Sequence, residues 1–100
     1  MALDWKGKAE IHKRDNCICA YCGFRGHDEV SYRFLSVDHI VRRANAGADA
    51  PENLVTACIH CNRILNSCTA GTIDAKREVV AARNHDYDVY FRESIRPHLK

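Results

Sequence analysis

The sequence predicts a small α+β domain in which two short strands joined by a turn are followed by a helix, with further helices at both ends. Three observations carry this prediction. Residues 32–41 have the side-chain alternation of a strand, and residues 45–53 are rich in turn-forming Gly, Asp, Pro and Asn. Two Cys-x-x-Cys motifs enclose both segments and predict a structural zinc ion that clamps the domain together.

The N-terminal half is predicted to hold a helix and the two strands. Trp5, Ala9 and His12 recur at helical spacing and predict a short helix ahead of the first cysteines. The alternating residues 32–41 form the first expected strand, and residues 54–56 form a short return strand after the turn. Because no repeat and no Pro- or Gly-rich linker interrupts the chain, we predict a single domain over residues 1–100.

The C-terminal half is predicted to be helical. From Cys58 onward no breaker interrupts the sequence, which predicts a helix of about two turns. A second helix restarts at Gly71 and Thr72 and is expected to end near Asn84, and a third forms the tail, so that the C-terminal helices cover about residues 72–96. The tail helix is expected to pack an apolar residue on the core. The candidates are Val89, Tyr90 or Phe91.

The composition argues against secreted and membrane proteins. Residues 1–15 lack the apolar stretch and cleavage site of a signal peptide, and no run approaches the roughly 18 apolar residues of a membrane span. We therefore predict a cytoplasmic protein without membrane contact. The net charge is +2, and basic residues gather downstream of residues 37–40, a pattern that fits phosphate binding as well as an ordinary solvated surface.

The two Cys-x-x-Cys motifs are the strongest chemical signal in the chain. Cys19 and Cys22 form the first motif, and Cys58 and Cys61 form the second. Each motif can place two thiolates on one turn, and together they supply the four ligands of a tetrahedral zinc ion. Such a site contributes on the order of 10 kcal/mol to folding, which would compensate for the modest core of a chain of this size.

Two other interpretations of the cysteines remain open at this point. Two disulfides would fit a secreted protein, and a redox-active dithiol would fit a Cys-x-x-Cys motif beside a βαβ unit. The chain has neither a signal peptide nor a βαβ pattern, which favours zinc. Cys17 and Cys68 lie outside both motifs, and we expect them to be buried apolar thiols.

The order of the motifs resembles that of the HNH endonuclease family. The chain reads RDNCICAYCG from Arg14, VDHI from Val37 and PENLVTACIHCN from Pro51, so the resemblance covers about residues 14–66. It implies that family's ββα-metal, or His-Me finger, core: a hairpin and a helix clamped by zinc, with a separate catalytic cation. The strands, turn and helix that the residues predict by themselves agree with this fold.

The resemblance implies that an Asp-His pair acts at a scissile phosphate. His39 matches the family's first histidine and would be the general base that activates water. Asp38 matches the metal-binding acid, and its carboxylate suits Mg²⁺ or Mn²⁺. Because neighbouring strand residues point to opposite faces, both can serve one site only where the strand bends or ends, so we expect a bulge or a strand end here. The alternatives are a hydrogen-bonded strand histidine and an exposed carboxylate.

The resemblance also assigns the polar residues that follow. Asn53 matches the family's central asparagine and would hydrogen-bond the backbone across the hairpin loop to hold His39, although it also suits an ordinary turn. Asn62 stands where the pattern often has histidine, so the chain is an H-N-N variant in which the Asn62 carbonyl oxygen would complete the cation site. Asn66 and His60 are the reserve candidates. The lost imidazole favours Mg²⁺ or Mn²⁺ over transition metals.

Together these assignments predict a metal-dependent endonuclease that hydrolyses phosphodiester bonds in DNA, with double-stranded DNA as the expected partner. Arg42, Arg43 and Arg63 are expected to contact phosphates without reading bases. No recognition module fits into 100 residues, so specificity is either low or supplied by a partner protein or a homodimer. The alternatives are a catalytically inactive zinc-stapled module that binds nucleic acid or protein, and a small secreted disulfide protein.

Overall fold

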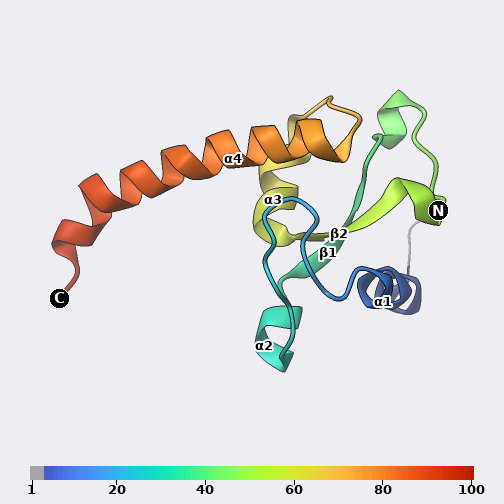
Figure 1. The fold of residues 1–100 in the computed structure, drawn as a ribbon, viewed down its shortest axis with the longest axis horizontal. Helices are drawn as coiled ribbons and strands as arrows, with labels where there is room; N and C mark the ends of the chain where they lie inside the picture. The colour runs from blue at the N-terminus through green and yellow to red at the C-terminus, as the bar shows by residue number, and fades with distance from the viewer. Residues whose placement is uncertain (1–3) are drawn as a thin grey trace.

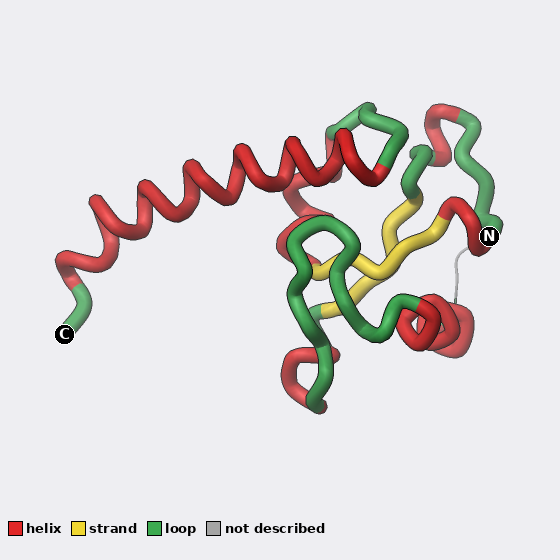
Figure 2. The backbone as a smooth tube through the Cα atoms, viewed as in Figure 1, coloured by secondary structure: helices red, strands yellow, loops and turns green. Residues whose placement is uncertain are grey.

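The computed structural model describes residues 4–100, so the first three residues of the predicted domain lie outside the described part (Figure 1). Five short turns of 3-10 or π helix accompany the regular helices and strands. In chain order the elements are α1 (Trp5–Arg14), α2 (Glu29–Tyr32), β1 (Leu35–His39), η1 (Arg43–Asn45), η2 (Pro51–Asn53), β2 (Leu54–Cys58), α3 (Ile59–Ile64), η3 (Leu65–Ser67), α4 (Ile73–Tyr90), η4 (Phe91–Ile95) and η5 (Arg96–His98). A two-stranded sheet surrounded by helices confirms the predicted α+β class (Figure 2).

A two-stranded antiparallel hairpin forms the centre of the molecule. Leu35 pairs with Cys58 at one end of the hairpin, and His39 pairs with Leu54 at the other. All five residues of β2 are buried, whereas β1 is half-buried beyond its first residue. Both predicted strands are confirmed with shifted bounds, since the first is shorter than expected and the return strand is longer.

Helix α2 replaces the start of the predicted first strand. Asp28 caps this helix by accepting a hydrogen bond from the Ser31 backbone N–H at 2.7 Å, and Ser31 Oγ accepts one from the Asp28 N–H at 3.3 Å. This reciprocal capping box stabilises a helical turn and was not identified from the sequence. The strand therefore begins at Leu35 instead of residue 32.

Helix α1 is confirmed, and it packs against both strands. Of the three residues whose spacing predicted it, His12 is buried, whereas Trp5 is 75% exposed. The His12 ring contacts the Tyr32 hydroxyl through Nδ1 at 2.8 Å and the Ser36 carbonyl oxygen through Nε2 at 3.2 Å. These contacts anchor α1 to the start of the hairpin.

Helix α3 follows β2 without a loop, at the position where the sequence predicted a helix. Cys58 is its N-cap, with Sγ accepting a hydrogen bond from the Cys61 backbone N–H at 3.4 Å. The main core lies where the hairpin, α3 and the start of α4 meet, and it includes Tyr21, Ala57 and Val80. This core holds the hairpin at a fixed angle to α3 and α4.

Helix α4 differs from the prediction because it is one continuous helix. It runs from its N-cap Thr72 to Tyr90 and continues into the π-helical turn η4, whereas the sequence predicted an end near Asn84. Residues 84–90 contain no Gly and no Pro, so no backbone signal ends the helix there.

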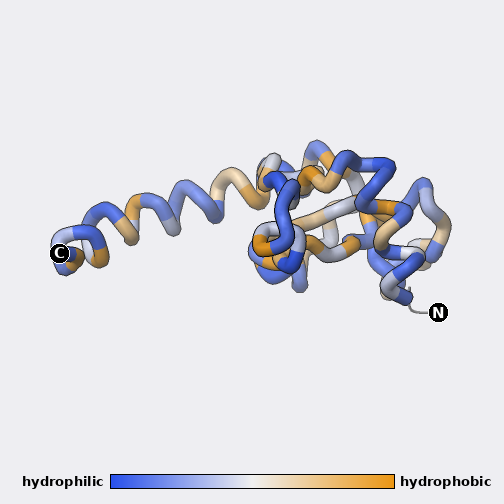
Figure 3. Tube along the Cα trace, turned by 90° about the horizontal axis from the view of Figure 1, so that it is seen from below, coloured by the Kyte–Doolittle hydropathy of each residue, from blue (hydrophilic) through white to orange (hydrophobic). Residues whose placement is uncertain are grey.

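The C-terminal part of α4 projects away from the hairpin (Figure 1). The predicted packing of the tail is wrong for Tyr90 and Phe91, which are 61% and 41% exposed, while Val89 is half-buried. Figure 3 shows this projecting part as a mixture of hydrophilic and hydrophobic residues. Within residues 4–100, no helix combines the length and apolar character that a membrane crossing requires.

Candidate functional site

The four cysteines of the two motifs meet at one end of the hairpin. The sulfur atoms of Cys19, Cys22, Cys58 and Cys61 all lie within 4.8 Å of one another, and the Sγ atoms of Cys22 and Cys58 are 3.7 Å apart. Zinc–sulfur bonds of about 2.3 Å in a tetrahedron place the sulfurs about 3.8 Å apart. The cluster therefore has the spacing and the donor chemistry of a structural zinc site.

Hydrogen bonds among these thiols couple their ionisation. Hydrogen bonds from the Cys58 and Cys61 thiols lower the pKa of Cys19, while the same network raises the pKa of Cys61. Burial raises the pKa of Cys22 to about 11. Four thiolates cannot coexist at this distance without a compensating charge, and zinc supplies that charge because it binds deprotonated thiols.

The structure overturns the disulfide interpretation of the cysteines. All six cysteines are free, so the chain is not the disulfide-stapled protein that was one alternative. Cys17 and Cys68 are half-buried, whereas the sequence predicted burial for both. Neither belongs to the group of four that can hold a metal ion.

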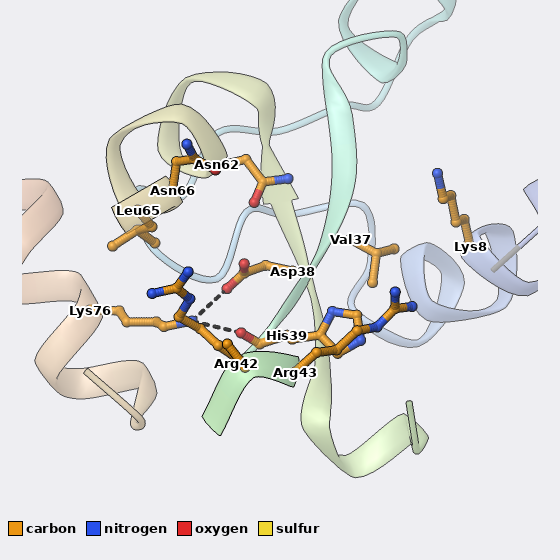
Figure 4. Close-up of a pocket in the computed structure, with 11 residues that line it drawn as sticks. Lys8, Val37, Asp38, His39, Arg42, Arg43, Asn62, Leu65, Asn66 and Lys76 are labelled. Carbon is orange, nitrogen blue, oxygen red and sulfur yellow. Dashed lines mark hydrogen bonds and ion pairs between the residues drawn. The ribbon is translucent and has the colours of Figure 1, made fainter. Parts of the chain in front are cut away.

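A charged cavity of 450 Å³ lies beside the opposite end of the hairpin (Figure 4). Strand β1 ends at His39, which is the strand end expected at the Asp38-His39 pair, and both side chains line this cavity. The full lining consists of Lys8, Val37, Asp38, His39, Arg42, Arg43, Ala44, Asn62, Leu65, Asn66 and Lys76. Three of the predicted polar site residues, Asp38, His39 and Asn62, therefore meet at one cavity.

His39 is oriented by an acid that the sequence analysis missed. Its Nε2 lies 2.7 Å from Oδ1 of Asp49, and Arg43 Nε donates to the same oxygen at 3.0 Å. The hydrogen bond from His39 and that from Arg43 hold the pKa of Asp49 well below its usual range. An ionised carboxylate only accepts hydrogen bonds, so Nε2 carries the proton and Nδ1 is the nitrogen that can accept one.

Asn53 makes the cross-loop contacts that the resemblance implied. Its Oδ1 accepts a hydrogen bond from the Val41 backbone N–H at 2.9 Å, and its Nδ2 donates to the carbonyl oxygens of Val41 at 3.0 Å and Ala48 at 2.8 Å. The Asn53 carbonyl also accepts from the Ile40 N–H at 2.9 Å. These bonds fix the chain directly after His39.

Asp38 has an unexpected partner in a buried lysine. Its Oδ2 accepts a hydrogen bond from the Tyr21 hydroxyl at 2.5 Å and one from Lys76 Nζ at 2.9 Å. Lys76 also donates to the His39 carbonyl oxygen at 2.7 Å, and its side chain is only 2% exposed. Within residues 4–100, no protein group hydrogen-bonds the second carboxylate oxygen, Oδ1.

Asn62 is better placed for a cation than either reserve candidate. Figure 4 shows its side chain pointing toward Asp38, and its Nδ2 donates to Ser36 Oγ, which leaves Oδ1 as the available ligand atom. Asn66 lines the same cavity. His60 lies away from it, with Nε2 2.7 Å from Asn84 Oδ1 on α4. A carboxylate and an amide oxygen are the hard donors that Mg²⁺ and Mn²⁺ prefer.

Two of the three predicted phosphate-binding arginines are at the cavity. Arg42 and Arg43 line it together with Lys8 and Lys76, so four basic side chains share the cavity with Asp38. Arg63 instead borders an apolar groove on another face of α3, and the expectation that it flanks the site does not hold. A basic cavity of this kind attracts phosphates.

Faint sequence signals existed for the two residues that were missed. Lys76 falls between Ile73 and Val80 at helical spacing, so it shares their inward face, where a lysine needs a partner. Asp49 stands in the turn of residues 45–53 and was interpreted only as a turn residue. Nothing in the local sequence links either residue to Asp38 or His39.

Comparison with known proteins agrees with this geometry. A family model described as HNH endonuclease matches residues 19–67. The CRISPR-associated endonuclease Cas9 of Corynebacterium diphtheriae is 42% identical to the chain over 52 residues, a segment that covers 51% of this chain and 4% of that relative. Residues 19–67, which contain both cysteine motifs and the Asp38-His39 pair, therefore match an HNH endonuclease domain.

Proposed function

We propose that the protein is a metal-dependent endonuclease that hydrolyses phosphodiester bonds in double-stranded DNA. The observation that supports this most strongly is the convergence of Asp38, His39 and Asn62 on one cavity rimmed by basic side chains. The family supports nuclease chemistry in general, and the cavity provides the groups that such chemistry needs. The chain spans about 4% of the length of the matched Cas9, so that relative's whole activity is not transferred to it.

His39 is the general base in this mechanism. With Nε2 held by Asp49, its Nδ1 takes a proton from a water molecule, and the resulting hydroxide attacks phosphorus. The bond between phosphorus and the 3′-oxygen breaks, and the leaving oxygen takes a proton from solvent. Asp49 stabilises the imidazolium that forms, and Asn53 keeps the loop that carries both residues in place.

A divalent cation, Mg²⁺ or Mn²⁺, would be held by Asp38 and Asn62 and would neutralise charge on the phosphoryl oxygens. The zinc site at the other end of the hairpin is structural, because four cysteine ligands leave zinc no open position. Arg42 and Arg43 bind the flanking phosphates without reading bases. Sequence selectivity is then either low or supplied by a partner protein or a second copy of the chain.

The domain 1–100 is proposed to fold as one unit around the zinc site and to work in the cytoplasm. Six free cysteines, four of them suited to zinc, support a reducing compartment.

One observation favours a second candidate, a nucleic-acid-binding module without catalysis. Asp38 is already paired with Lys76 at 2.9 Å, so part of its charge is neutralised before a cation arrives. Such a module would bind duplex DNA through the basic cavity and cleave nothing with any divalent cation.

A plasmid assay separates the two candidates. Zinc-loaded protein, dialysed free of other divalent ions, is incubated with supercoiled plasmid and then supplied with Mg²⁺ or Mn²⁺. We expect nicking that requires the added cation and falls by about 10²- to 10⁴-fold in His39→Ala. His85→Ala, on the exposed side of α4, is the matched control and keeps full activity.

Zinc content and circular dichroism are measured for each variant, so that a lost fold is not taken for a lost base. Binding without cleavage by a folded, zinc-loaded wild type would support the inactive module. Cleavage by His39→Ala at the wild-type rate would refute the general-base assignment.

A further inference from the structure

The cavity carries more positive than negative charge. Of the residues that line it, Asp38 is the one acid, against four basic side chains, Lys8, Arg42, Arg43 and Lys76, of which Arg43 is also paired with Asp49 at 3.0 Å. A divalent cation entering this cavity alone meets an environment that repels it. The charge balance therefore needs an anion in addition to the protein's own ligands.

Lys76 has the largest effect on this balance, because it is fixed directly on the cation ligand. Its ammonium is 2.9 Å from Asp38 Oδ2, and a second bond to the His39 carbonyl oxygen at 2.7 Å keeps it there. The centroid of the Tyr21 ring lies 5.7 Å from Lys76 Nζ, so the ring covers another side of the ammonium group. A side chain that is 2% exposed cannot swing into solvent when a cation approaches.

Lys76 thus offsets the single carboxylate of the cation site, while Asn62 contributes only a neutral oxygen. Mg²⁺ and Mn²⁺ in such sites accept one or two carboxylates together with phosphate oxygens of the substrate. Here the protein supplies one carboxylate whose charge is already paired. A phosphodiester between Arg42 and Asp38 would supply the missing negative charge and at the same time be attracted by the basic rim.

We propose that the catalytic cation and the nucleic-acid phosphate bind cooperatively, and that Lys76 sets this coupling by neutralising Asp38 until a phosphate arrives. The inference rests on the proposed function and describes how the same site is controlled. Lys76 acts through Asp38 and is a positioning residue. The protein binds divalent cations weakly when free and tightly when nucleic acid occupies the cavity.

Binding measurements test this coupling without relying on cleavage. The parent protein is zinc-loaded His39→Ala, which keeps Asp38 and Asn62 but lacks the base. Affinity for a short fluorescent DNA duplex is measured by anisotropy at constant ionic strength with and without Mn²⁺, and Mn²⁺ affinity of the free protein is measured by electron paramagnetic resonance. Coupling is reciprocal, so we expect Mn²⁺ to tighten duplex binding by about tenfold or more.

Lys76→Met is the decisive variant, since it removes the charge and keeps most of the side-chain volume. We expect it to raise the Mn²⁺ affinity of the free protein by about tenfold and to reduce the coupling by a similar factor. Lys8→Met removes a positive charge that lines the same cavity but forms no ion pair with Asp38, and it is expected to change either quantity by less than about threefold.

Two further variants keep the test decisive if Lys76→Met does not fold. Asp38→Asn removes the charged cation ligand, so any effect of Mn²⁺ on its duplex binding arises from the DNA itself. Tyr21→Phe removes the other hydrogen bond to the same Asp38 oxygen without a change of charge, and it should leave the coupling intact. Coupling in the parent that exceeds coupling in Asp38→Asn supports the proposal, and equal coupling in both overturns it.

The outcomes also separate this inference from the proposed function. Tight Mn²⁺ binding by the free protein, unchanged by Lys76→Met, would overturn the inference and leave the nuclease site standing. If Asp38→Asn and its parent bind no Mn²⁺ with or without duplex, the cation site of the proposed function fails, and the inference fails with it.

Discussion

The two ends of one hairpin differ in almost every physical property. At the end where Leu35 pairs with Cys58, four thiols lie within 4.8 Å of one another, and all but one of them are buried. At the end where His39 pairs with Leu54, charged side chains line an open cavity of 450 Å³. The difference teaches that the domain gathers the thiols suited to a stabilising metal ion at one end and leaves the groups of the proposed reaction accessible at the other.

The strands themselves carry the same asymmetry. Strand β2 is buried throughout and connects the cysteine cluster to Asn53, which precedes it directly. Strand β1 is half-buried and carries Asp38 and His39 at its end. A buried strand thus supports a half-buried one that carries the proposed catalytic groups, which places the site without a large core around it.

The largest loss of stability is expected from a substitution in the cysteine cluster at one end of the hairpin. Cys61→Ser should lose zinc and unfold the chain, because a structural zinc ion contributes on the order of 10 kcal/mol. Circular dichroism and zinc content check this. Cys68→Ser, outside the cluster, is the matched control and should retain both. A folded Cys61→Ser protein that still holds one zinc ion would show that the cluster is not the support we describe.

A smaller effect is expected at the other end from Asn53→Ala. The variant loses three side-chain hydrogen bonds to Val41 and Ala48, which together contribute about 2–4 kcal/mol. Urea unfolding should show this loss, while the zinc content stays unchanged. Asn45→Ala, an exposed residue of the same loop, is the control and should be neutral. Loss of zinc in Asn53→Ala would mean that the two ends do not separate as proposed.

Asp49→Asn sharpens the comparison further, because it should affect activity and leave stability nearly unchanged. Asparagine can still contact His39, but it can neither select one tautomer nor stabilise the imidazolium, so the cleavage rate is expected to fall by roughly 10- to 100-fold. Single-turnover cleavage and thermal unfolding are measured together. An unchanged rate would remove Asp49 from the mechanism.

The smallest effect on stability is expected at low pH, and it should reach both ends of the hairpin at once. Asp15 accepts a hydrogen bond from the Thr56 backbone N–H, in the middle of β2, at 2.8 Å. Burial opposes the ionisation of Asp15, but the hydrogen bonds from Arg14 and Thr56 outweigh it and lower the pKa of Asp15. The resulting stabilisation is present above the unfolded-state pKa near 3.9 and is lost as the pH falls below it.

Asp15→Asn should therefore lower the stability at neutral pH and show a flatter loss of stability below about pH 4 than the wild type. Thermal unfolding between neutral pH and pH 3 is the measurement. If the two proteins lose stability in parallel over this range, Asp15 is not the group that titrates.

Much of the hairpin and its two ends could be predicted because their signals are local or tied to fixed spacing. The two cysteine motifs, the turn of residues 45–53 and the Asp38-His39 pair each lie within a few residues of chain. The arrangement of these segments around one hairpin followed from the resemblance to the HNH endonuclease family that the order of the motifs carries. The strand bounds shifted because a four-residue helix with its own capping box begins where alternation alone suggested a strand.

The parts that were missed depend on contacts between distant segments. Lys76 reaches Asp38 across 38 positions of the chain, and no local pattern selects that partner. Helical spacing indicates that a lysine faces inward but not which acid it meets. The uninterrupted course of α4 past Asn84 was missed for a related reason, since a helical pattern does not show where a helix leaves the core.

The continuity of α4 gives the molecule a mechanical property. Its 18 residues span roughly 27 Å, with Lys76 in the first turn and Tyr90 at the far end. A straight helix transmits rotation and pull along its axis, so the projecting end acts as a lever whose short arm is bonded to the end of β1. Between the projecting end and Lys76, the helix is held by Val80 in the main core and by Asn84, whose Oδ1 lies 2.7 Å from His60 Nε2, so a load on the lever reaches the core and α3 before it reaches Asp38.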